Sequence, residues 1–418
     1  MSRLVVEGGR RLSGTVEVEG TKNAALPLLA ACLLTREECV LENAPRIRDI
    51  EAMCRLLQGL GAEVGGVGTS TLRVRCREIR TADPEPELVA RLRGSVLLLA
   101  PLVARTGRVA LGEPGGDFPG RRSVATHHRA LAAFGAVPET AGGSALVAPH
   151  GLRGASLYLD EASVTATETA LLAAVTATGT SEIRHAAAEP HVVELARSLR
   201  RMGADIAGEG TSTLRVGGVP RLGGTVHRID GDFIEAGTWA VAAAVTGGDV
   251  EVRGARAADL EPIVHVLSRF GLRCELGDES LRVRESTLEA AGRVTTGVWP
   301  GFPTDMVSLV TVLAAHARGS TLVHDWLYEL RVFALEQLSG MGADLFLCDP
   351  HRIVVTGPRR LRGRALDSRD IRSGMALVVA ALAAEGRSRI ESLETIERGY
   401  ARLVERLRGL GAAVEREA

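Results

Sequence analysis

The sequence predicts an α/β fold of two domains, each built from three repeats of about 70 residues. Two observations predict this fold. An apolar residue followed by glycine recurs six times along the 418-residue chain, and a helical segment that is apolar nearly all round precedes each copy. Helices without a polar face are typically buried on all sides. Each repeat therefore contains a buried helix, a strand, an exposed helix and further strands.

The repeated glycines mark the ends of the exposed helices. They are Gly61, Gly135, Gly203, Gly271, Gly342 and Gly411, so their spacings are 74, 68, 68, 71 and 69 residues. Each suits the position just after a helix, where a positive φ favours glycine. A hairpin-like stretch follows most of them, and residues 68–74 and 210–216 are identical in sequence.

Six apolar segments are predicted to be the buried helices, each followed by a turn and a strand-forming stretch. In chain order they cover residues 24–34, 95–105, 169–177, 238–246, 306–317 and 374–384. We expect residues 21–229 to form the first three-repeat domain. Residues 230–418 together with 1–20 form the second, because the N-terminal strands at 4–6 and 15–19 precede the first repeat.

Composition and charge exclude several classes of function. The net charge of −1 lacks the basic excess of a general nucleic-acid binder. The apolar runs are too short to span a bilayer, and the start of the chain lacks the apolar core of a signal peptide, so we predict a cytoplasmic protein without a membrane partner. The six cysteines lack metal-ligand spacing, and no phosphate-binding P-loop occurs. No metal and no cofactor are predicted.

Polar or charged residues lie at the starts of the buried helices. They are Lys22 with Asn23, Arg93, Glu168, Glu235, Asp305, and Asp370 with Arg372. Capping of the helix explains amide and acidic residues, and Asn23 and Asp305 suit that role. Capping does not explain Lys22, which is the only lysine of the chain, nor Arg93 and Arg372, because cations oppose the helix dipole there. We therefore expect these cations to bind a phosphate or a carboxylate.

A loop rich in glycine and proline at residues 112–122 carries Asp117, five residues before Arg122. Its composition suits a plain turn. The same loop also suits an acid–base group beside an anion site, because a carboxylate there can exchange protons with a bound substrate. His127 and His128 follow the loop, and a pair of histidines is more often a packing or surface feature than a catalytic one.

Residues 20–27, Gly-Thr-Lys-Asn-Ala-Ala-Leu-Pro, resemble the enolpyruvyl transferase family, in the branch whose acceptor is UDP-N-acetylglucosamine. The resemblance covers essentially the whole chain, with further matching stretches at 93–95, 114–117, 163–169, 299–306, 370–373 and 397–400. It implies two inside-out α/β domains, each of the inside-out α/β barrel type, with helix N-termini facing an inter-domain active-site cleft. It also implies transfer of enolpyruvate from phosphoenolpyruvate to the 3′-hydroxyl of UDP-N-acetylglucosamine with release of phosphate, the first committed step of peptidoglycan precursor synthesis in cell wall biogenesis.

The resemblance also implies roles for individual residues. Asp117 would hold the position of the general acid, where many members have cysteine, and Asp305 would be the base near the acceptor hydroxyl. The residues implied to bind phosphoenolpyruvate are Lys22, Arg93, Arg122, Arg372 and Arg398. Those expected to bind the acceptor are Asn23, His127, Ser163, Val164, Thr165 and Tyr328. A crowded anionic intermediate needs such fixed cations and a matched acid–base pair.

The acceptor side departs from the family pattern in several places. Glu161 stands where a lysine would meet the diphosphate, and Ala125 stands where an aspartate would line the uracil pocket. The stretches at 188–190 and 328–331 also differ, whereas the phosphoenolpyruvate side keeps the pattern. Two alternatives therefore stay open: a relative that acts on another nucleotide or sugar, such as a nucleoside monophosphate, and a catalytically silent paralogue that only binds anions.

Overall fold

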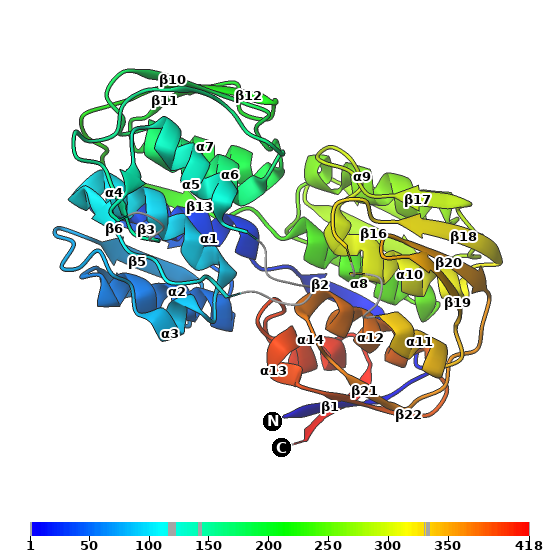
Figure 1. Cartoon of the computed structure of the whole chain (residues 1–418). Coiled ribbons are helices and arrows are strands. Elements are labelled where there is room, and N and C mark those ends of the chain that lie inside the picture. Colours follow the sequence, from blue (N-terminus) through cyan, green and yellow to red (C-terminus); the bar gives the residue numbers. More distant parts are fainter. Residues whose placement is uncertain (1, 116–122, 141–143, 330, 332–334, 418) are drawn as a thin grey trace. The chain divides into compact units, whose positions relative to one another are not determined.

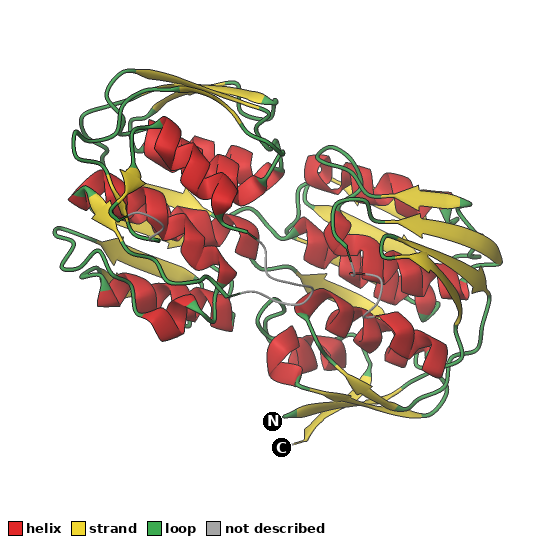
Figure 2. Cartoon of the chain, viewed as in Figure 1, coloured by secondary structure: helices red, strands yellow, loops and turns green. Residues whose placement is uncertain are grey.

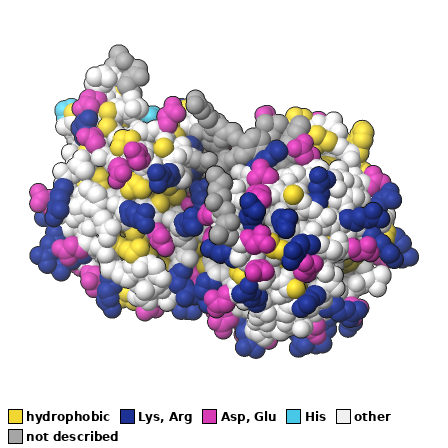
Figure 3. All heavy atoms as spheres, turned by 90° about the horizontal axis from the view of Figure 1, so that it is seen from below, with side chains coloured by type: hydrophobic (Ala, Val, Ile, Leu, Met, Phe, Trp, Pro, Cys, Tyr) yellow, Lys and Arg dark blue, Asp and Glu magenta, His cyan; other side chains and the backbone are white. Residues whose placement is uncertain are grey.

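The computed structural model describes residues 2–115, 123–140, 144–329, 331 and 335–417. Within these residues the chain forms two compact units: an N-terminal unit of residues 20–230, and a C-terminal unit of residues 2–19 and 231–417. In each unit the sheets cover a centre of helices (Figures 1 and 2). No helix in the described part of the chain has the length and apolar character needed to cross a membrane. On the face drawn in Figure 3, arginine and carboxylate side chains are interspersed, consistent with the near-zero net charge.

The elements of the N-terminal unit follow the repeat order expected from the sequence. Its helices are α1 (Lys22–Ala31), η1 (Cys32–Leu34), α2 (Arg48–Gly59), α3 (Pro86–Val89), η2 (Arg93–Leu98), α4 (Leu99–Thr106), α5 (Ala125–Ala133), α6 (Val164–Ala174) and α7 (Pro190–Arg201), where η denotes a 3-10 helix. Its strands are β3 (Glu38–Glu42), β4 (Glu63–Gly65), β5 (Thr71–Arg75), β6 (Arg108–Val109), β7 (Val137–Pro138), β8 (Leu146–Val147), β9 (Ser156–Tyr158), β10 (Thr180–Arg184), β11 (Asp205–Ala207), β12 (Thr213–Gly217) and β13 (Thr225–Arg228). They form sheets of order β13-β3-β5-β4, β6-β8-β7 and β11-β12-β10-β9.

The C-terminal unit begins with the first two strands of the chain. Its helices are α8 (Phe233–Val245), α9 (Ala257–Arg269), η3 (Thr304–Met306), α10 (Val307–His316), α11 (Glu336–Gly340), α12 (Ile371–Ala383), α13 (Leu393–Ile396) and α14 (Leu403–Gly409). Its strands are β1 (Arg3–Glu7), β2 (Ser13–Glu17), β14 (Asp249–Arg253), β15 (Arg273–Gly277), β16 (Ser280–Arg284), β17 (Arg293–Thr295), β18 (Gly319–His324), β19 (Asp344–Asp349), β20 (Arg352–Gly357), β21 (Ala365–Asp367), β22 (Arg387–Glu391) and β23 (Ala413–Glu417). The sheet orders are β21-β22-β1-β23, β15-β16-β14-β2 and β17-β18-β20-β19.

The N-terminal strands complete two sheets of the C-terminal unit. Strand β1 lies between β22 and β23 and pairs antiparallel with both, with Leu4 opposite Ile390 and Val6 opposite Val414. Strand β2 runs parallel to β14 at the edge of its sheet. Both ends of the chain are therefore needed to build the last repeat.

The predicted helix ends are confirmed. All six repeated glycines have φ between +82° and +109°, a region that residues with a side chain rarely adopt. The apolar helices are also buried as expected: α8, α10 and α12 contact one another, and nearly every residue of each is buried. The repeated glycines therefore predict the helix ends correctly, and the missing polar face predicts the burial of the helices correctly.

Two of the predicted helix starts are wrong. Helix α6 begins at Val164 rather than at residue 169, and α8 begins at Phe233 rather than at residue 238. Ser163 and Asp232 cap these helices, because their side chains accept hydrogen bonds from backbone N–H groups of the first turn. Glu168 and Glu235 consequently lie inside the helices and not ahead of them.

Candidate functional site

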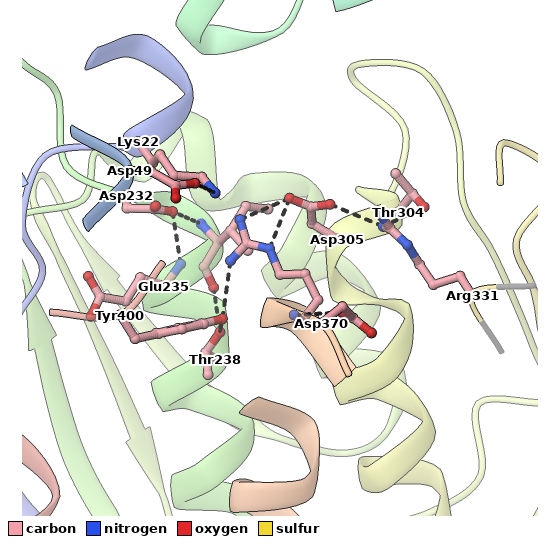
Figure 4. A network of polar contacts seen from close by, with 12 residues as sticks. Lys22, Asp49, Asp232, Glu235, Thr238, Thr304, Asp305, Arg331, Asp370 and Tyr400 are labelled. Carbon is pink, nitrogen blue, oxygen red and sulfur yellow. Dashed lines mark hydrogen bonds and ion pairs between the residues drawn. The ribbon is translucent and has the colours of Figure 1, made fainter. Parts of the chain in front are cut away.

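Asp305 lies in η3, at the start of α10, and arginines hold both of its carboxylate oxygens (Figure 4). Oδ2 lies 2.9 Å from Nη2 and 3.1 Å from Nε of Arg372, and Oδ1 accepts a hydrogen bond of 3.0 Å from Nη1 of Arg331. The arginine side chains are 11% and 12% exposed, whereas that of Asp305 is 24% exposed. Charge-assisted pairs on both sides fix the orientation of this carboxylate while leaving part of it accessible.

Arg372 is the second residue of α12, and the cap of that helix helps to place it. Asp370 Oδ1 accepts hydrogen bonds of 2.9 Å from the backbone N–H of both Arg372 and Ser373. Nη1 of Arg372 donates to the hydroxyl of Tyr400 at 3.2 Å, and that hydroxyl lies 2.9 Å from Oγ1 of Thr238. Asp370 thus holds the backbone of Arg372, and the buried Tyr400 holds its guanidinium.

Electrostatics keep the Arg372 guanidinium charged. Burial alone would lower the pKa of Arg372, but the carboxylate of Asp305, followed by Tyr400 and Asp232, outweighs burial and raises it. Burial raises the pKa of Tyr400 and of Asp232. The arrangement is a permanent cation at the N-terminus of a buried helix.

In the N-terminal unit, Lys22 is the first residue of α1 and forms an ion pair with Asp49. Its Nζ lies 3.1 Å from Oδ2 of Asp49, and the two side chains are 16% and 6% exposed. Asp49 lies in the first turn of α2, where a carboxylate is favoured by the helix dipole. Thr21, and not Asn23, occupies the cap position of α1, and its side chain makes no capping hydrogen bond.

The cations at the helix starts therefore already have partners within the protein. Asp49 meets Lys22, Asp305 meets Arg372, and Arg93 donates to the backbone carbonyl of Ser123 at 3.1 Å. For Lys22 and Arg372 these partners are carboxylates of the protein, whereas the partner of Arg93 is a backbone carbonyl. Asp305 is likewise not a helix cap, because Pro303 holds the cap position of η3.

Several predicted acceptor residues meet at the start of α6. Ser163 caps the helix, Val164 and Thr165 form its first turn, and Oγ1 of Thr165 lies 2.9 Å from Nε2 of His127 on α5. Burial, followed by the charge of Arg93, lowers the pKa of His127 to about 4, so the ring is neutral at pH 7.

The remaining predicted site residues are Tyr328, Arg398, Asp117 and Arg122. The ring of Tyr328 lies beside Arg331, 4.8 Å from Cζ of the guanidinium to the ring centroid. Arg398 follows α13, and its backbone N–H donates to the carbonyl of Thr395 at 3.3 Å. Asp117 and Arg122 lie outside the described residues. Within the described part of the chain, no group of three or more potential side-chain ligands is arranged to hold a metal ion.

Sequence reasoning missed Asp49, Thr304 and Arg331. Asp49 and Lys22 are separated by 27 residues, and no sequence pattern links them. Thr304 lies in the stretch at 299–306 that carries the family resemblance, and that position was the available signal, whereas Arg331 lies in the stretch at 328–331 that departs from the family pattern. Glu161 is exposed in the turn before α6, and Ala125 is the first residue of α5.

Comparison with known proteins identifies the family. The sequence model of the EPSP synthase (3-phosphoshikimate 1-carboxyvinyltransferase) family matches residues 6–407. UDP-N-acetylglucosamine 1-carboxyvinyltransferase of Bradyrhizobium diazoefficiens is 44% identical over 420 residues, which cover 99% of this chain and 97% of the relative. The protein of the same name from Treponema denticola is 40% identical over 423 residues, covering 99% of both chains.

Solved structures agree with the fold. The enolpyruvyl transferase NikO from Streptomyces tendae superposes with a TM-score of 0.89 at 26% identity, covering 99% of this chain and 98% of that one. EPSP synthase from Acinetobacter baumannii superposes with a TM-score of 0.77 at 18% identity over 100% of both chains, which shows the shared fold alone. The predicted fold class and the predicted resemblance are both confirmed. The six repeats, the family match along nearly the whole length and the full-length relatives together show that the chain belongs to the enolpyruvyl transferase family.

Proposed function

We propose that this protein transfers the enolpyruvyl group of phosphoenolpyruvate to the 3′-hydroxyl of UDP-N-acetylglucosamine and releases phosphate, in peptidoglycan precursor synthesis in the cytoplasm. The observation that carries this proposal is the full-length identity of 44% and 40% to relatives named for that reaction. The polar clusters around Asp305 and Lys22 support it, because the reaction needs both a proton acceptor and fixed cations.

In this reaction the acceptor oxygen forms a bond to C2 of phosphoenolpyruvate, while its proton passes to a base and C3 gains a proton from an acid. The C2–O bond to phosphate then breaks, and C3 loses a proton to restore the double bond. We assign Asp305 as the base and Asp117 as the acid. The side chain of Asp305 is 24% exposed, so its carboxylate is accessible to a substrate hydroxyl while the two arginines orient it.

The anionic groups of phosphoenolpyruvate require cations with donors to spare. Among the described contacts, Arg372 uses three of its five N–H donors on Asp305 and Tyr400. The remaining two suit a carboxylate or phosphate oxygen. We assign Lys22, Arg93, Arg122 and Arg398 to the same substrate, and Asn23, His127, Ser163, Val164, Thr165 and Tyr328 to the acceptor.

Release of inorganic phosphate from phosphoenolpyruvate tests the proposal, with UDP-N-acetylglucosamine, other UDP-sugars and nucleoside monophosphates as acceptors. We expect acceptor-dependent release with UDP-N-acetylglucosamine and its loss in Asp305→Asn. Asp344→Asn is the matched control, because Asp344 is an exposed carboxylate paired with Arg359 at 2.5 Å. Absence of release with every acceptor would support the silent paralogue.

A second candidate is the same chemistry on another nucleotide or sugar. The exposed carboxylate of Glu161, ahead of Ser163, favours it, because a carboxylate repels a diphosphate at that position. Glu161→Lys distinguishes the two. If UDP-N-acetylglucosamine is the natural acceptor, Glu161→Lys lowers the KM for UDP-N-acetylglucosamine by at most a small factor. If a different acceptor is natural, Glu161→Lys lowers the KM for UDP-N-acetylglucosamine strongly and raises the turnover of that substrate.

A further inference from the structure

Asp325 is a buried hydrogen-bond acceptor directly after β18 in the C-terminal unit. It is 0% exposed, and donors reach both of its carboxylate oxygens. Oδ1 accepts from the hydroxyl of Thr296 at 2.8 Å and from the backbone N–H of Leu327 at 3.3 Å. Oδ2 accepts from the hydroxyl of Thr304 at 2.7 Å. A carboxylate that is satisfied in this way orients the hydroxyl groups around it.

The Thr304 hydroxyl links Asp325 to Asp305 through Arg331. Nη1 of Arg331 lies 2.9 Å from Oγ1 of Thr304 and 3.0 Å from Oδ1 of Asp305 (Figure 4). A guanidinium only donates, so Thr304 accepts from Arg331 and its own proton points to Asp325. The direction of every hydrogen bond in the chain Asp325–Thr304–Arg331–Asp305 is thereby determined.

Such a chain is stronger than its separate bonds, because a hydroxyl that donates to an anion becomes a better acceptor. Arg372 holds Oδ2 of Asp305 and Arg331 holds Oδ1, so the contact of Arg331 adds to the resistance of the carboxylate to rotation. The side chain of Arg331 is 12% exposed, which limits its alternatives in solvent.

We propose that Asp325 is a positioning residue that aims the carboxylate of Asp305 through Thr304 and Arg331. The inference rests on the proposed function, in which Asp305 accepts the proton of the acceptor hydroxyl. Asp325 does not touch substrate in this role. Asp325 fixes the direction of the Thr304 hydroxyl, and that hydroxyl fixes the position of the Arg331 guanidinium. The guanidinium in turn orients the carboxylate of Asp305 that accepts the proton.

A pair of substitutions at Thr304 separates positioning from packing. Thr304→Val keeps the side-chain shape and removes the hydroxyl, whereas Thr304→Ser keeps the hydroxyl and removes a methyl group. We expect Thr304→Val to lower kcat by about tenfold or more, because small misplacements of a reacting group cost that much. The KM for phosphoenolpyruvate stays within about twofold, since uniform substrate binding is retained. Thr304→Ser keeps kcat near that of the parent protein.

Thr321→Val is the matched control. Thr321 is a 0% exposed threonine of β18 whose hydroxyl has no hydrogen-bond partner among the residues that the structure describes, so its loss should leave kcat unchanged. Asp325→Asn should lower kcat as Thr304→Val does, because an amide cannot accept from both threonines at once. Equal kcat values for Thr304→Val and Thr304→Ser, or parental kcat in Asp325→Asn, would overturn the inference.

Failure of the proposed function has a different signature. The parent protein would then release no phosphate with any acceptor. Crystal structures of Thr304→Val and the parent protein test the positioning in that case without activity. We expect the separation of Arg331 Nη1 and Asp305 Oδ1, 3.0 Å in the parent, to exceed hydrogen-bond range in the variant. An unchanged separation would overturn the inference.

Discussion

Replacing the only lysine of the chain separates its contribution to stability from its contribution to catalysis. From sequence alone, Lys22→Ala should abolish activity with little loss of stability. The ion pair with Asp49 revises the second half of that expectation. Breaking a fully buried pair from one side costs about 3–5 kcal/mol, and an exposed pair contributes about 0–1 kcal/mol. With side chains 16% and 6% exposed, we expect Lys22→Met to cost about 2 kcal/mol between these limits.

A double-mutant cycle measures this contribution. Urea unfolding of Lys22→Met, Asp49→Asn and the double variant gives the coupling free energy of the pair. We expect the double variant to unfold within about 1 kcal/mol of the parent, because removing both charges avoids an uncompensated one. Phosphate release should nevertheless be lost in both variants that lack Lys22. Parental turnover in Lys22→Met, or recovery of turnover in the double variant, would refute the assignment of Lys22 to the substrate.

Three further outcomes follow from other parts of the chain. The pKa of His127 is about 4 in the folded protein, below its ordinary value, so the unfolded chain binds a proton on this ring more readily than the folded chain does. The free energy of unfolding measured in urea should therefore rise by about 3 kcal/mol as the pH increases from about 4 to 6.5. His127→Gln should lose this pH dependence. Arg406→Met should cost about 3–5 kcal/mol, because it breaks a pair with Glu235 in which both side chains are at most 6% exposed; Arg406→Met with Glu235→Gln should cost less. If Asp117 holds the position that the resemblance implies, where many family members have cysteine, mass spectrometry after incubation with an epoxide that alkylates that thiol should find no adduct at residue 117.

Local chemistry made the repeat and its helices predictable. A glycine directly after a helix indicates a positive φ, and all six predicted glycines have a positive φ. A helix without a polar face indicates burial, as α12 illustrates. The starts of α6 and α8 were less predictable, because Thr165 and Glu168 in α6 look polar in sequence although Glu168 is 1% exposed. Burial, followed by Glu189, raises the pKa of Glu168 well above its usual range, which a sequence pattern does not reveal.

Several residues of the candidate site were predictable from the sequence, whereas their contacts were not. The sequence pointed to Lys22, Asp305 and Arg372 because their types and places match a family motif. It did not reveal that Lys22 meets Asp49 or that Arg372 meets Asp305, since these pairs are separated by 27 and 67 residues. An ion pair depends on distance and burial, and residue type alone sets neither.

By itself, the sequence determined the repeat period, the glycines at the ends of the exposed helices, the buried helices apart from the starts of α6 and α8, and the family. Each of these depends on residue types and their spacing along the chain. Only the tertiary structure decided that β1 lies between β22 and β23, that protein carboxylates meet the helix-start cations, and that Asp325 reaches Asp305 through Thr304 and Arg331. The single lysine stood out in the composition, and its partner emerged only when α1 and α2 were brought together. The physical reason is that hydrogen bonds and ion pairs act over a few ångströms, so folding must first bring distant segments of the chain into contact.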